Sequence, residues 1–238
     1  MSIQSSPFVQ RLIHSYIRSN FVIPVRFRGL NIRIRPFSYD PVVMYSLLIR
    51  RIYGNVPRGC SVVDVGAHVG IFSLYSVLSG SKEVLAFEPE SRNFQLLHQN
   101  LHSNRLHERI HSFNMAVWSS EGERTLFTSR GSAFHGFFPD KLHAGGFEKV
   151  RCIGINTVLK QVDPPVLLKI DAEGSEYEII EHMTNENLEK LQRIALEYHV
   201  SNPDLRDRLP HLLRFLRTRG FTVSLRPDHP ILIATKGV

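Results

Sequence analysis

The chain is poor in cysteine and has no long hydrophobic run. Cys60 and Cys152 are the only cysteines among its 238 residues, too few for a disulfide framework or a zinc site built on cysteine. A run of about 18 apolar residues, which a membrane-spanning helix needs, does not occur, and the N-terminus has no apolar segment of signal-peptide length. These absences predict a protein of a reducing compartment, and the expected location is the cytoplasm.

The chain has an excess of basic residues, with a net charge of +7 and a pI of about 9.6. A basic surface attracts nucleic acids and anionic membranes. Here no recognisable DNA- or RNA-binding module accompanies the charge. The histidines are scattered and lack the spacing of metal ligands. We therefore interpret the charge as a solvated basic surface, and nucleic acid is not the favoured partner.

The most informative segment is residues 62–70, Val-Val-Asp-Val-Gly-Ala-His-Val-Gly. Its two initial valines are typical of the end of a buried parallel strand, and Gly66 and Gly70 allow a tight turn into an apolar helix from Ile71. Glycines let the backbone approach a ligand closely, and a helix N-terminus suits a nucleotide. The segment predicts a nucleotide-binding turn. Its candidate ligand contacts are Asp64, Gly66, Ala67, His68 and Gly70.

A second strand, residues 84–87, runs directly into Glu88 and Pro89. Pro89 ends this strand because proline cannot donate a hydrogen bond to a neighbouring strand. An acidic residue at the tip of the second strand, about 20 residues past the glycine turn, holds the hydroxyls of a ribose. Glu88 is therefore the predicted ribose ligand, and the ligand is of the adenosine type.

The turn distinguishes between two such ligands, a nicotinamide dinucleotide and S-adenosylmethionine. A dinucleotide fingerprint has glycines at its first, third and sixth positions. Counted from Gly66, this chain has His68 at the third position and Ile71 at the sixth. His68 would crowd a pyrophosphate, and Ile71 would hinder close packing of the helix on the strand. Asp64 suits a ligand with a positive end, such as a sulfonium, so the turn favours S-adenosylmethionine.

A third motif, residues 167–178, is a hydrophobic strand that ends in an acidic turn, Leu-Leu-Lys-Ile-Asp-Ala-Glu-Gly-Ser-Glu-Tyr-Glu. Together with VVDVGAHVG and AFEPESRNFQLLHQN, it resembles the FkbM family of S-adenosylmethionine-dependent methyltransferases, over about residues 39–235. The resemblance implies a Rossmann-like α/β fold with a seven-stranded sheet and helices on both faces. It also implies, usually, O-methylation of a hydroxyl on a small molecule or sugar. The family commonly has Asn where this chain has His68.

The motifs place the methyltransferase domain at residues 56–238, after an N-terminal extension at residues 1–55. Apolar residues recur at helical spacing from Phe8 to Ile17, which predicts an amphipathic helix that packs on its own domain, forms a homodimer or lies on a membrane surface. The period-two pattern of residues 22–35 predicts a hairpin. Residues 41–53 return to helical spacing.

The rest of the chain alternates strands with helices, as a doubly wound sheet does. Residues 129–149, rich in glycine and aromatic residues, form either a substrate lid or a plain flexible loop. The resemblance implies that Asn114 and Ala116, at the end of the third strand, lie beside the adenine. The other predicted elements are a helix at 93–104 with Phe94, Leu97 and Leu101 inward, strands at 110–117, 124–128 and 150–155, a helix at 209–219, and a closing hairpin at 221–225 and 231–235.

Polar residues at the ends of the fourth and fifth strands are the candidate catalytic groups, because ligands of open α/β sheets bind beyond the strand carboxyl ends. They are Asp171 and Glu173, then Glu197 and His199. His199 has a pKa suited to a general base. Lys169 lies inside a central strand, and we expect it to pair with Asp171 or Glu197, in a catalytic or a structural role. Mg²⁺ held by the three carboxylates is an alternative, not favoured because no ligand spacing requires it.

These motifs predict an enzyme that transfers a methyl group from S-adenosylmethionine to a hydroxyl of a small-molecule or glycan acceptor. One alternative is a nucleotide-binding interaction module without catalysis, which the full acidic set at the strand ends disfavours. The other is a nicotinamide-dependent oxidoreductase, which the glycine turn disfavours.

Overall fold

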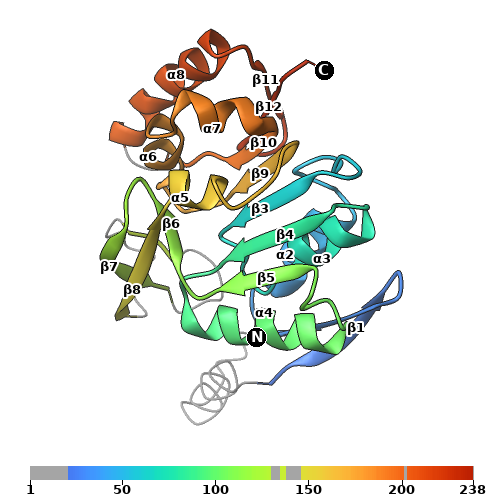
Figure 1. Cartoon of the computed structure of the whole chain (residues 1–238). Helices are drawn as coiled ribbons and strands as arrows, with labels where there is room; N and C mark the ends of the chain where they lie inside the picture. The colour runs from blue at the N-terminus through green and yellow to red at the C-terminus, as the bar shows by residue number, and fades with distance from the viewer. Residues whose placement is uncertain (1–20, 130–134, 138–145, 201–202, 238) are drawn as a thin grey trace, which may run out of the picture.

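The computed structural model describes residues 21–129, 135–137, 146–200 and 203–237 (Figure 1). The amphipathic helix predicted between Phe8 and Ile17 lies outside these residues, and so does any dimer contact that it makes. Among the described residues, no helix is long and apolar enough to cross a membrane. Cys60 and Cys152 are both buried free thiols.

The centre of the fold is a mixed sheet of seven strands in the order β11-β12-β10-β9-β3-β4-β5. Neighbouring strands are parallel from β10 through β5, whereas β12 is antiparallel to both β10 and β11. This arrangement confirms the seven-stranded Rossmann-like sheet with its closing antiparallel pair. The strands are β3 (Ser61–Val65), β4 (Glu83–Phe87), β5 (Ile110–Phe113), β9 (Val166–Ile170), β10 (Leu191–Glu197), β11 (Thr222–Leu225) and β12 (Ile231–Thr235).

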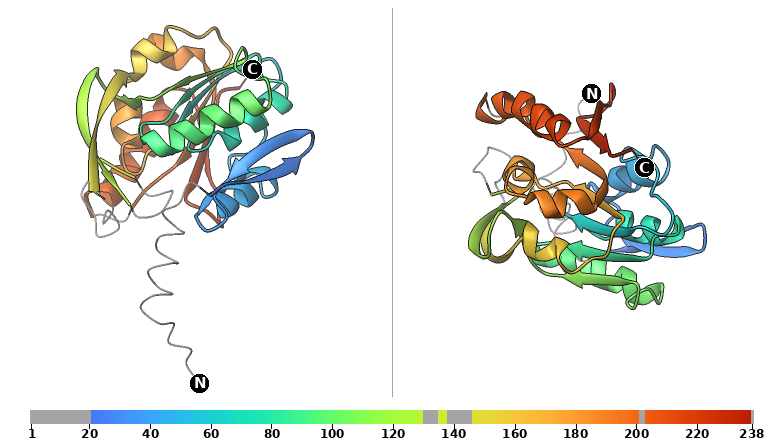
Figure 2. Two further views of the ribbon diagram at one scale, coloured as in Figure 1. Left: turned by 90° about the horizontal axis from the view of Figure 1, so that it is seen from below. Right: turned by 45° about the horizontal axis from the view of Figure 1, so that its top comes forward.

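Helices cover both faces of the sheet, as the two views of Figure 2 show. Successive strand residues point to opposite faces, so Val62 packs into one hydrophobic core and Val63 into the other. The first core lies under α2 (Asp40–Leu48), α3 (Ile71–Leu78) and α4 (Ser91–Ser103). The second lies under α5 (Ile155–Leu159), α6 (Glu176–Glu181), α7 (Asn185–Lys190) and α8 (Pro203–Thr218).

The predicted hairpin is present as β1 (Ile23–Phe27) and β2 (Leu30–Ile34), and it lies beside α4 (Figure 1). Leu30, Ile32 and Ile34 are buried in the same core as α3 and α4. Two asparagines accept from backbone N–H groups of β2: Asn104, the residue after the end of α4, accepts from Asn31 at 2.7 Å, and Asn100 of α4 accepts from Arg33 at 2.7 Å. The hairpin is therefore fixed to the methyltransferase part of the chain by side chains at the C-terminal end of α4.

The predicted third strand, 110–117, is two strands of different sheets. β5 ends at Phe113, and β6 (Ala116–Trp118) pairs with β8 (Gly146–Gly154) in a small sheet that β7 (Gly122–Thr128) completes. Asn114 explains the break, because its side-chain amide donates to the carbonyls of Glu88 and Pro89, both at 3.0 Å, and so turns the chain out of the large sheet. β8 also extends the strand that was predicted to begin at Val150.

Three helices differ from their prediction. α2 ends at Leu48, although helical spacing was predicted to continue to residue 53. In α4, Leu97 and Leu101 are buried as expected, but Phe94 is only half-buried, and Asn93 and Asn100 are buried instead. Their amides bond to the N-terminal extension, which a hydrophobic pattern does not reveal. α8 begins at Pro203 and not at Leu209, because proline suits the first turn of a helix.

The charged residue inside β9 pairs with a partner that the sequence did not indicate. Lys169 Nζ lies 3.1 Å from Asp64 Oδ1 on β3, and it donates to the carbonyls of Val65 and Gly66 at 3.2 and 2.6 Å. The expected pairing with Asp171 or Glu197 is wrong, because β9 lies between β3 and β10 and its register places Lys169 directly beside Asp64. Burial opposes the charge of Lys169, but Asp64 and then Asp171 raise its pKa.

We predict that Lys169→Met lowers the free energy of unfolding by about 3–5 kcal/mol, because the substitution leaves Asp64 buried and unpaired. Urea unfolding followed by circular dichroism measures this loss. Lys82→Met is the matched control, since it removes an exposed pair with Asp163 whose side chains are 55% and 77% exposed, and it should have little effect. Equal losses in both variants would contradict the prediction.

Candidate active site

A cavity of about 350 Å³ lies beyond the carboxyl ends of β3, β4, β9 and β10. Its position is the one that an open α/β sheet predicts for a ligand. Nine of the residues predicted as site residues line it: Gly66, Ala67, His68, Glu88, Ala116, Lys169, Asp171, Glu173 and Glu197. Four do not line it: Asp64, Gly70, Asn114 and His199.

The two glycines of the turn are required by the packing of the chain. A Cβ at Gly66 would lie 1.9 Å from the carbonyl oxygen of Asp171, and φ of Gly66 is +71°. A Cβ at Gly70 would lie 3.2 Å from Leu97 Cγ, and φ there is +85°. The expectation that the missing side chains leave space for a ligand is therefore corrected: at Gly66 that space is taken by the carbonyl of Asp171, just after β9, and at Gly70 by Leu97. The close approach instead brings the turn next to Asp171.

Glu88 is buried at the end of β4, where it holds the turn. Its Oε2 accepts from the His68 N–H at 2.8 Å, and its Oε1 accepts from the Glu90 N–H at 2.9 Å. Burial raises the pKa of Glu88 to about 7, although these two hydrogen bonds act in the opposite direction. Each carboxylate oxygen has a second lone pair, and Glu88 lines the cavity. Glu88 can therefore accept from two hydroxyl groups.

His68 connects the turn to the N-terminal extension. Its φ is +53°, a conformation in which histidine and asparagine are both enriched, which accounts for His68 in place of the usual Asn. Its Nε2 lies 3.4 Å from Asp40 Oδ1 at the start of α2. Asp40 is fully buried and accepts two bonds from the Arg35 guanidinium, at 2.9 and 3.0 Å. Burial raises the pKa of Asp40, but Arg35 and His68 outweigh it and lower the pKa.

Asp64 and Asn114 do not line the cavity and instead bond to other residues of the protein. Asp64 is fully buried, accepts from the Ser73 hydroxyl at 2.6 Å and pairs with Lys169. Its charge is therefore already balanced, which corrects the expectation of a direct contact with a positive ligand. The side-chain amide of Asn114 donates to the carbonyls of Glu88 and Pro89, in the turn after β4. Ala116, two residues on, does line the cavity, together with Val117.

Tyr53 is a site residue that the sequence did not reveal. Its hydroxyl lies 3.1 Å from both Asp171 Oδ2 and Glu197 Oε2, so it stands between the ends of β9 and β10. Burial, together with these two carboxylates, raises the pKa of Tyr53 well above its usual value. Tyr53 precedes its partners by 118 and 144 residues, and no spacing rule connects residues so distant.

The hydrogen bonds of the Tyr53 phenol depend on the protonation of the two carboxyl groups beside it. A phenol has one hydrogen and donates to one acceptor at a time, so Tyr53 can bond both carboxylates only when one of them is protonated. Burial first, and then the charge of Asp171, raise the pKa of Glu197 to about 7. A pKa near neutrality at the end of β10 is the property of an efficient general base.

His199 is held as an imidazolium, which corrects its assignment as a candidate base. Its Nε2 lies 3.2 Å from Glu173, and its Nδ1 lies 3.1 Å from Glu176, which also accepts from the His199 backbone N–H at 2.7 Å. Burial opposes the charge, but the bonds to the two glutamates outweigh it and raise the pKa of His199 well above its usual value. A histidine that stays protonated at neutral pH cannot accept a proton.

Among the described residues, Asp171, Glu173 and His199 form a group with the spacing of metal ligands. Ligand atoms of Asp171, Glu173 and His199 lie within 4.8 Å of one another. This set differs from the predicted oxygen cluster, since His199 takes the place of Glu197. Mg²⁺ prefers oxygen ligands, and both nitrogens of His199 face carboxylates as donors. The donor set in this arrangement does not suit Mg²⁺.

The glycine- and aromatic-rich stretch predicted as a lid or loop lies partly outside the described residues. In its described part, Gly136 exchanges backbone hydrogen bonds with Phe127 of β7. Phe137 packs edge-on against Trp118, with 5.1 Å between ring centroids. His135 and Phe137 both line the cavity. This part of the stretch therefore forms a wall of the site, alongside Leu126.

A mixed seven-stranded sheet with a ligand cavity at its carboxyl edge is the Rossmann-like methyltransferase fold. The family model described as the methyltransferase FkbM domain matches residues 64–223. The chain belongs to this family, as the sequence motifs predicted. Family membership does not favour a nicotinamide-dependent oxidoreductase or a nucleotide-binding module without catalysis.

Individual relatives differ in how much of their length they share with the chain. It is 27% identical over 212 residues to 31-O-demethyl-FK506 methyltransferase FkbM of Streptomyces tacrolimicus, covering 75% of this chain and 78% of that protein. It is 27% identical over 146 residues to hexuronic acid methyltransferase AglP of Haloferax volcanii, covering 57% of this chain and 54% of that one. The match to AMB antimetabolite synthetase AmbE of Pseudomonas aeruginosa, 26% over 251 residues, covers 85% of this chain but 11% of that protein.

Among solved structures, the methyltransferase FkbM from Methylobacillus flagellatus superposes with a TM-score of 0.54 at 18% sequence identity. The match covers 80% of this chain and 47% of the Methylobacillus protein, so this chain spans about half the length of that protein. At this identity the likeness concerns the fold.

The contacts of His199 with Glu173 and Glu176 predict a free energy of unfolding that depends on pH. Because folding raises the pKa of His199, its contribution is fully present below the unfolded pKa of about 6.5 and is lost as the pH rises through the raised folded value. Urea unfolding of the wild type minus His199→Gln should therefore show a larger stability difference at pH 6 than at pH 9. A difference that is constant, or that grows with pH, would contradict an imidazolium at this position.

Proposed function

We propose that the chain transfers a methyl group from S-adenosylmethionine to a hydroxyl oxygen. The observation that supports this most directly is the single cavity that joins the turn at Gly66 and the buried Glu88 to the carboxylates of Asp171 and Glu197. When bound, S-adenosylmethionine supplies an electrophilic methyl group on a positively charged sulfur.

The donor set of the cavity fits this cofactor. Glu88 accepts hydroxyl hydrogens at the end of β4, as a ribose requires. Ala116, Val117 and Phe87 provide apolar walls for an adenine. Asp171 supplies negative charge at the end of β9, which favours a sulfonium. Asp64 and Lys169 act as positioning residues, because their buried pair fixes the strand ends on either side of the turn.

The chain's own contribution to the reaction is to orient the acceptor and to take one proton. Positioning of two reactants supplies most of the acceleration in such a transfer. Glu197, with its pKa of about 7, is the general base in this proposal and receives the hydroxyl proton. The protonated Glu197 then donates a hydrogen bond to the Tyr53 oxygen, and the Tyr53 hydroxyl donates its own hydrogen to Asp171. Leu126, His135 and Phe137 form one wall of the cavity in which the transfer takes place.

The acceptor class in this proposal is a hydroxyl-bearing small molecule or glycan. Its support comes from the names of two relatives, one a methyltransferase of 31-O-demethyl-FK506 and the other of hexuronic acid. Both names describe organic molecules of small size, and one names an oxygen as the methylated atom.

We predict that the wild type binds S-adenosylmethionine and not NAD, and that Glu88→Gln weakens this binding by about 1–3 kcal/mol, the contribution of hydrogen bonds to a charged acceptor. Because the pKa of Glu88 is about 7, wild-type affinity should fall as the pH drops below 7, whereas that of Glu88→Gln should not. Isothermal titration calorimetry at pH 6 and pH 8 measures both. Binding of NAD alone would reject the proposal.

We predict that Tyr53→Phe raises the pKa of Glu197 above 7, because the tyrosine hydrogen bond lowers it. The acid limb of the pH–rate profile should move to higher pH, and turnover at pH 7 should fall roughly tenfold, or about 1.4 kcal/mol. Carbon-13 NMR of labelled glutamate measures the pKa without an acceptor. Tyr75→Phe, in a buried tyrosine of α3 that does not line the cavity, is the control. An unchanged Glu197 pKa in Tyr53→Phe would remove the tyrosine from the proton path.

A further inference from the structure

Large hydrophobic side chains that are exposed to solvent are concentrated in one part of the molecule. Six of the nine among the described residues lie between Phe21 and Ile49. Single exposed hydrophobic residues are normal on a protein surface, whereas a contiguous group marks a binding surface. The concentration on the N-terminal extension therefore needs a physical explanation.

The centre of this group is a stripe formed by Val42 and Tyr45 of α2 and by Ile49, the residue that caps its C-terminus, which we call the α2 stripe. Their side chains are 57%, 56% and 59% exposed. The spacing i, i+3 and i+7 places all three on one side of the helix. Val42 also lines the cavity, as do Val43 and Ser46 on the adjoining side of α2. The stripe is therefore continuous with the wall of the cavity.

The helix that carries the stripe is held firmly in place. Its first residue, Asp40, is bonded to Arg35 and faces His68 of the cofactor turn. At its other end, Arg50 pairs with Asp228 at 3.4 Å, and Arg226 donates to the carbonyl of Arg51 at 3.2 Å. The stripe is thus an ordered surface that is presented at a fixed position beside the cavity.

The cavity is too small to hold a cofactor and a large acceptor together. Pockets that enclose one drug-sized ligand have volumes of about 300–1,000 Å³, and this cavity, at about 350 Å³, lies at the lower end. A bound cofactor would leave room for the reacting end of the acceptor alone. The remainder of the acceptor must then lie outside, against whatever borders the cavity.

We propose that the α2 stripe binds the apolar body of the methyl acceptor, and that the acceptor is an amphipathic alcohol whose hydroxyl enters the cavity. This inference rests on the proposed methyl transfer and narrows its substrate class. The hydroxyl reaches the carboxylates at the ends of β9 and β10, while several consecutive carbons of the acceptor cover Val42, Tyr45 and Ile49. Burial of these apolar surfaces supplies the affinity, and the carboxylates supply the orientation.

The test uses the full chain with S-adenosylhomocysteine bound and n-butyl, n-hexyl and n-octyl β-D-glucoside as probes, each below its micelle concentration. Calorimetry should show an affinity that rises by about fourfold for each added methylene, which corresponds to about 0.8 kcal/mol per buried CH₂. The double variant Tyr45→Ser, Ile49→Ser should bind n-octyl glucoside about tenfold more weakly. Its affinity for S-adenosylhomocysteine should be unchanged, because neither residue lines the cavity.

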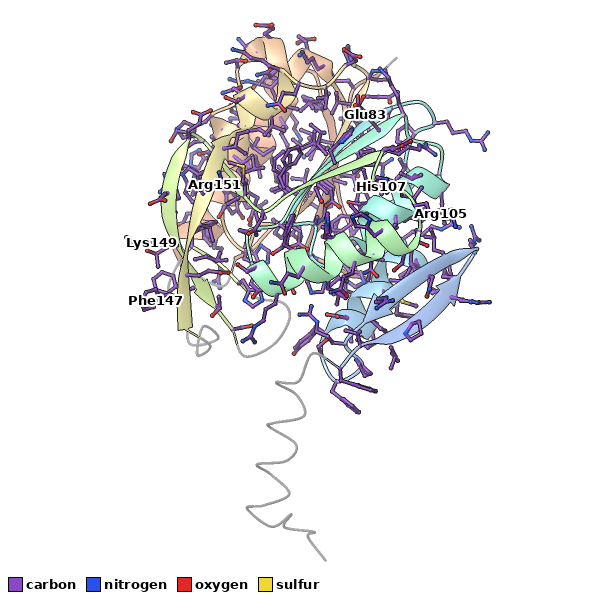
Figure 3. The ribbon with its side chains drawn as sticks, turned by 60° about the horizontal axis from the view of Figure 1, so that its bottom comes forward. Glu83, Arg105, His107, Phe147, Lys149 and Arg151 are labelled. Carbon is purple, nitrogen blue, oxygen red and sulfur yellow. The ribbon has the colours of Figure 1, made fainter. Side chains whose placement is uncertain are left out.

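The matched control is Phe147→Ser with Leu78→Ser, two exposed hydrophobic residues outside the stripe. Phe147 points outward from β8, next to Lys149 and Arg151 (Figure 3). The control should bind the glucosides as the wild type does. The inference is overturned if affinity does not depend on chain length, or if the control loses as much as the stripe variant. It is also overturned if the stripe variant only converts a dimer into a monomer. Failure of S-adenosylhomocysteine to bind at all would instead reject the proposed methyl transfer.

Discussion

The buried ion pair between Asp64 and Lys169 joins the two halves of the site. β3 leads into the glycine turn and β9 leads into Asp171 and Glu173, and the pair lies where the register of the two strands places Asp64 beside Lys169. Lys169 also donates to the carbonyl of Gly66, whose missing side chain lets the Asp171 carbonyl approach. The backbone N–H of Asp171 also donates to the carbonyl of Val65 at 3.1 Å, so side-chain and backbone contacts together place the glycine turn beside Asp171. A charged pair at the centre of a parallel sheet is costly to bury, and here it holds together the two elements that the chemistry needs.

The N-terminal extension completes the site as well as covering the fold. Tyr53 links Asp171 to Glu197, Asp40 faces His68 of the turn, and α2 forms one border of the cavity. The family model begins at residue 64, so it does not include α2, Asp40 or Tyr53. The cavity is therefore lined both by residues inside the range that the family model matches and by residues of the N-terminal extension before it.

Much of the fold could be predicted from the sequence, because it depends on local patterns. The strand, glycine turn and helix at residues 61–78, the acidic end of β4 and the closing hairpin each follow from hydrophobic spacing and from Gly and Pro positions. Contacts between distant residues could not be predicted. The partner of Lys169 depends on which strand lies beside β9, and the break after Phe113 depends on a side-chain bond of Asn114. His199 illustrates the same limit, since its two glutamates are visible in the sequence but their geometry is not.

The central claim is that one cavity joins Glu88 to the carboxylates of Asp171 and Glu197 and that the cofactor lies between them. A crystal structure of the full chain with S-adenosylhomocysteine tests it most directly. We predict ribose hydroxyls bonded to Glu88, an adenine beside Ala116, and the sulfur on the side of the cavity that Asp171 and Tyr53 border. Density for the ligand elsewhere, or a ribose without a bond to Glu88, would contradict it.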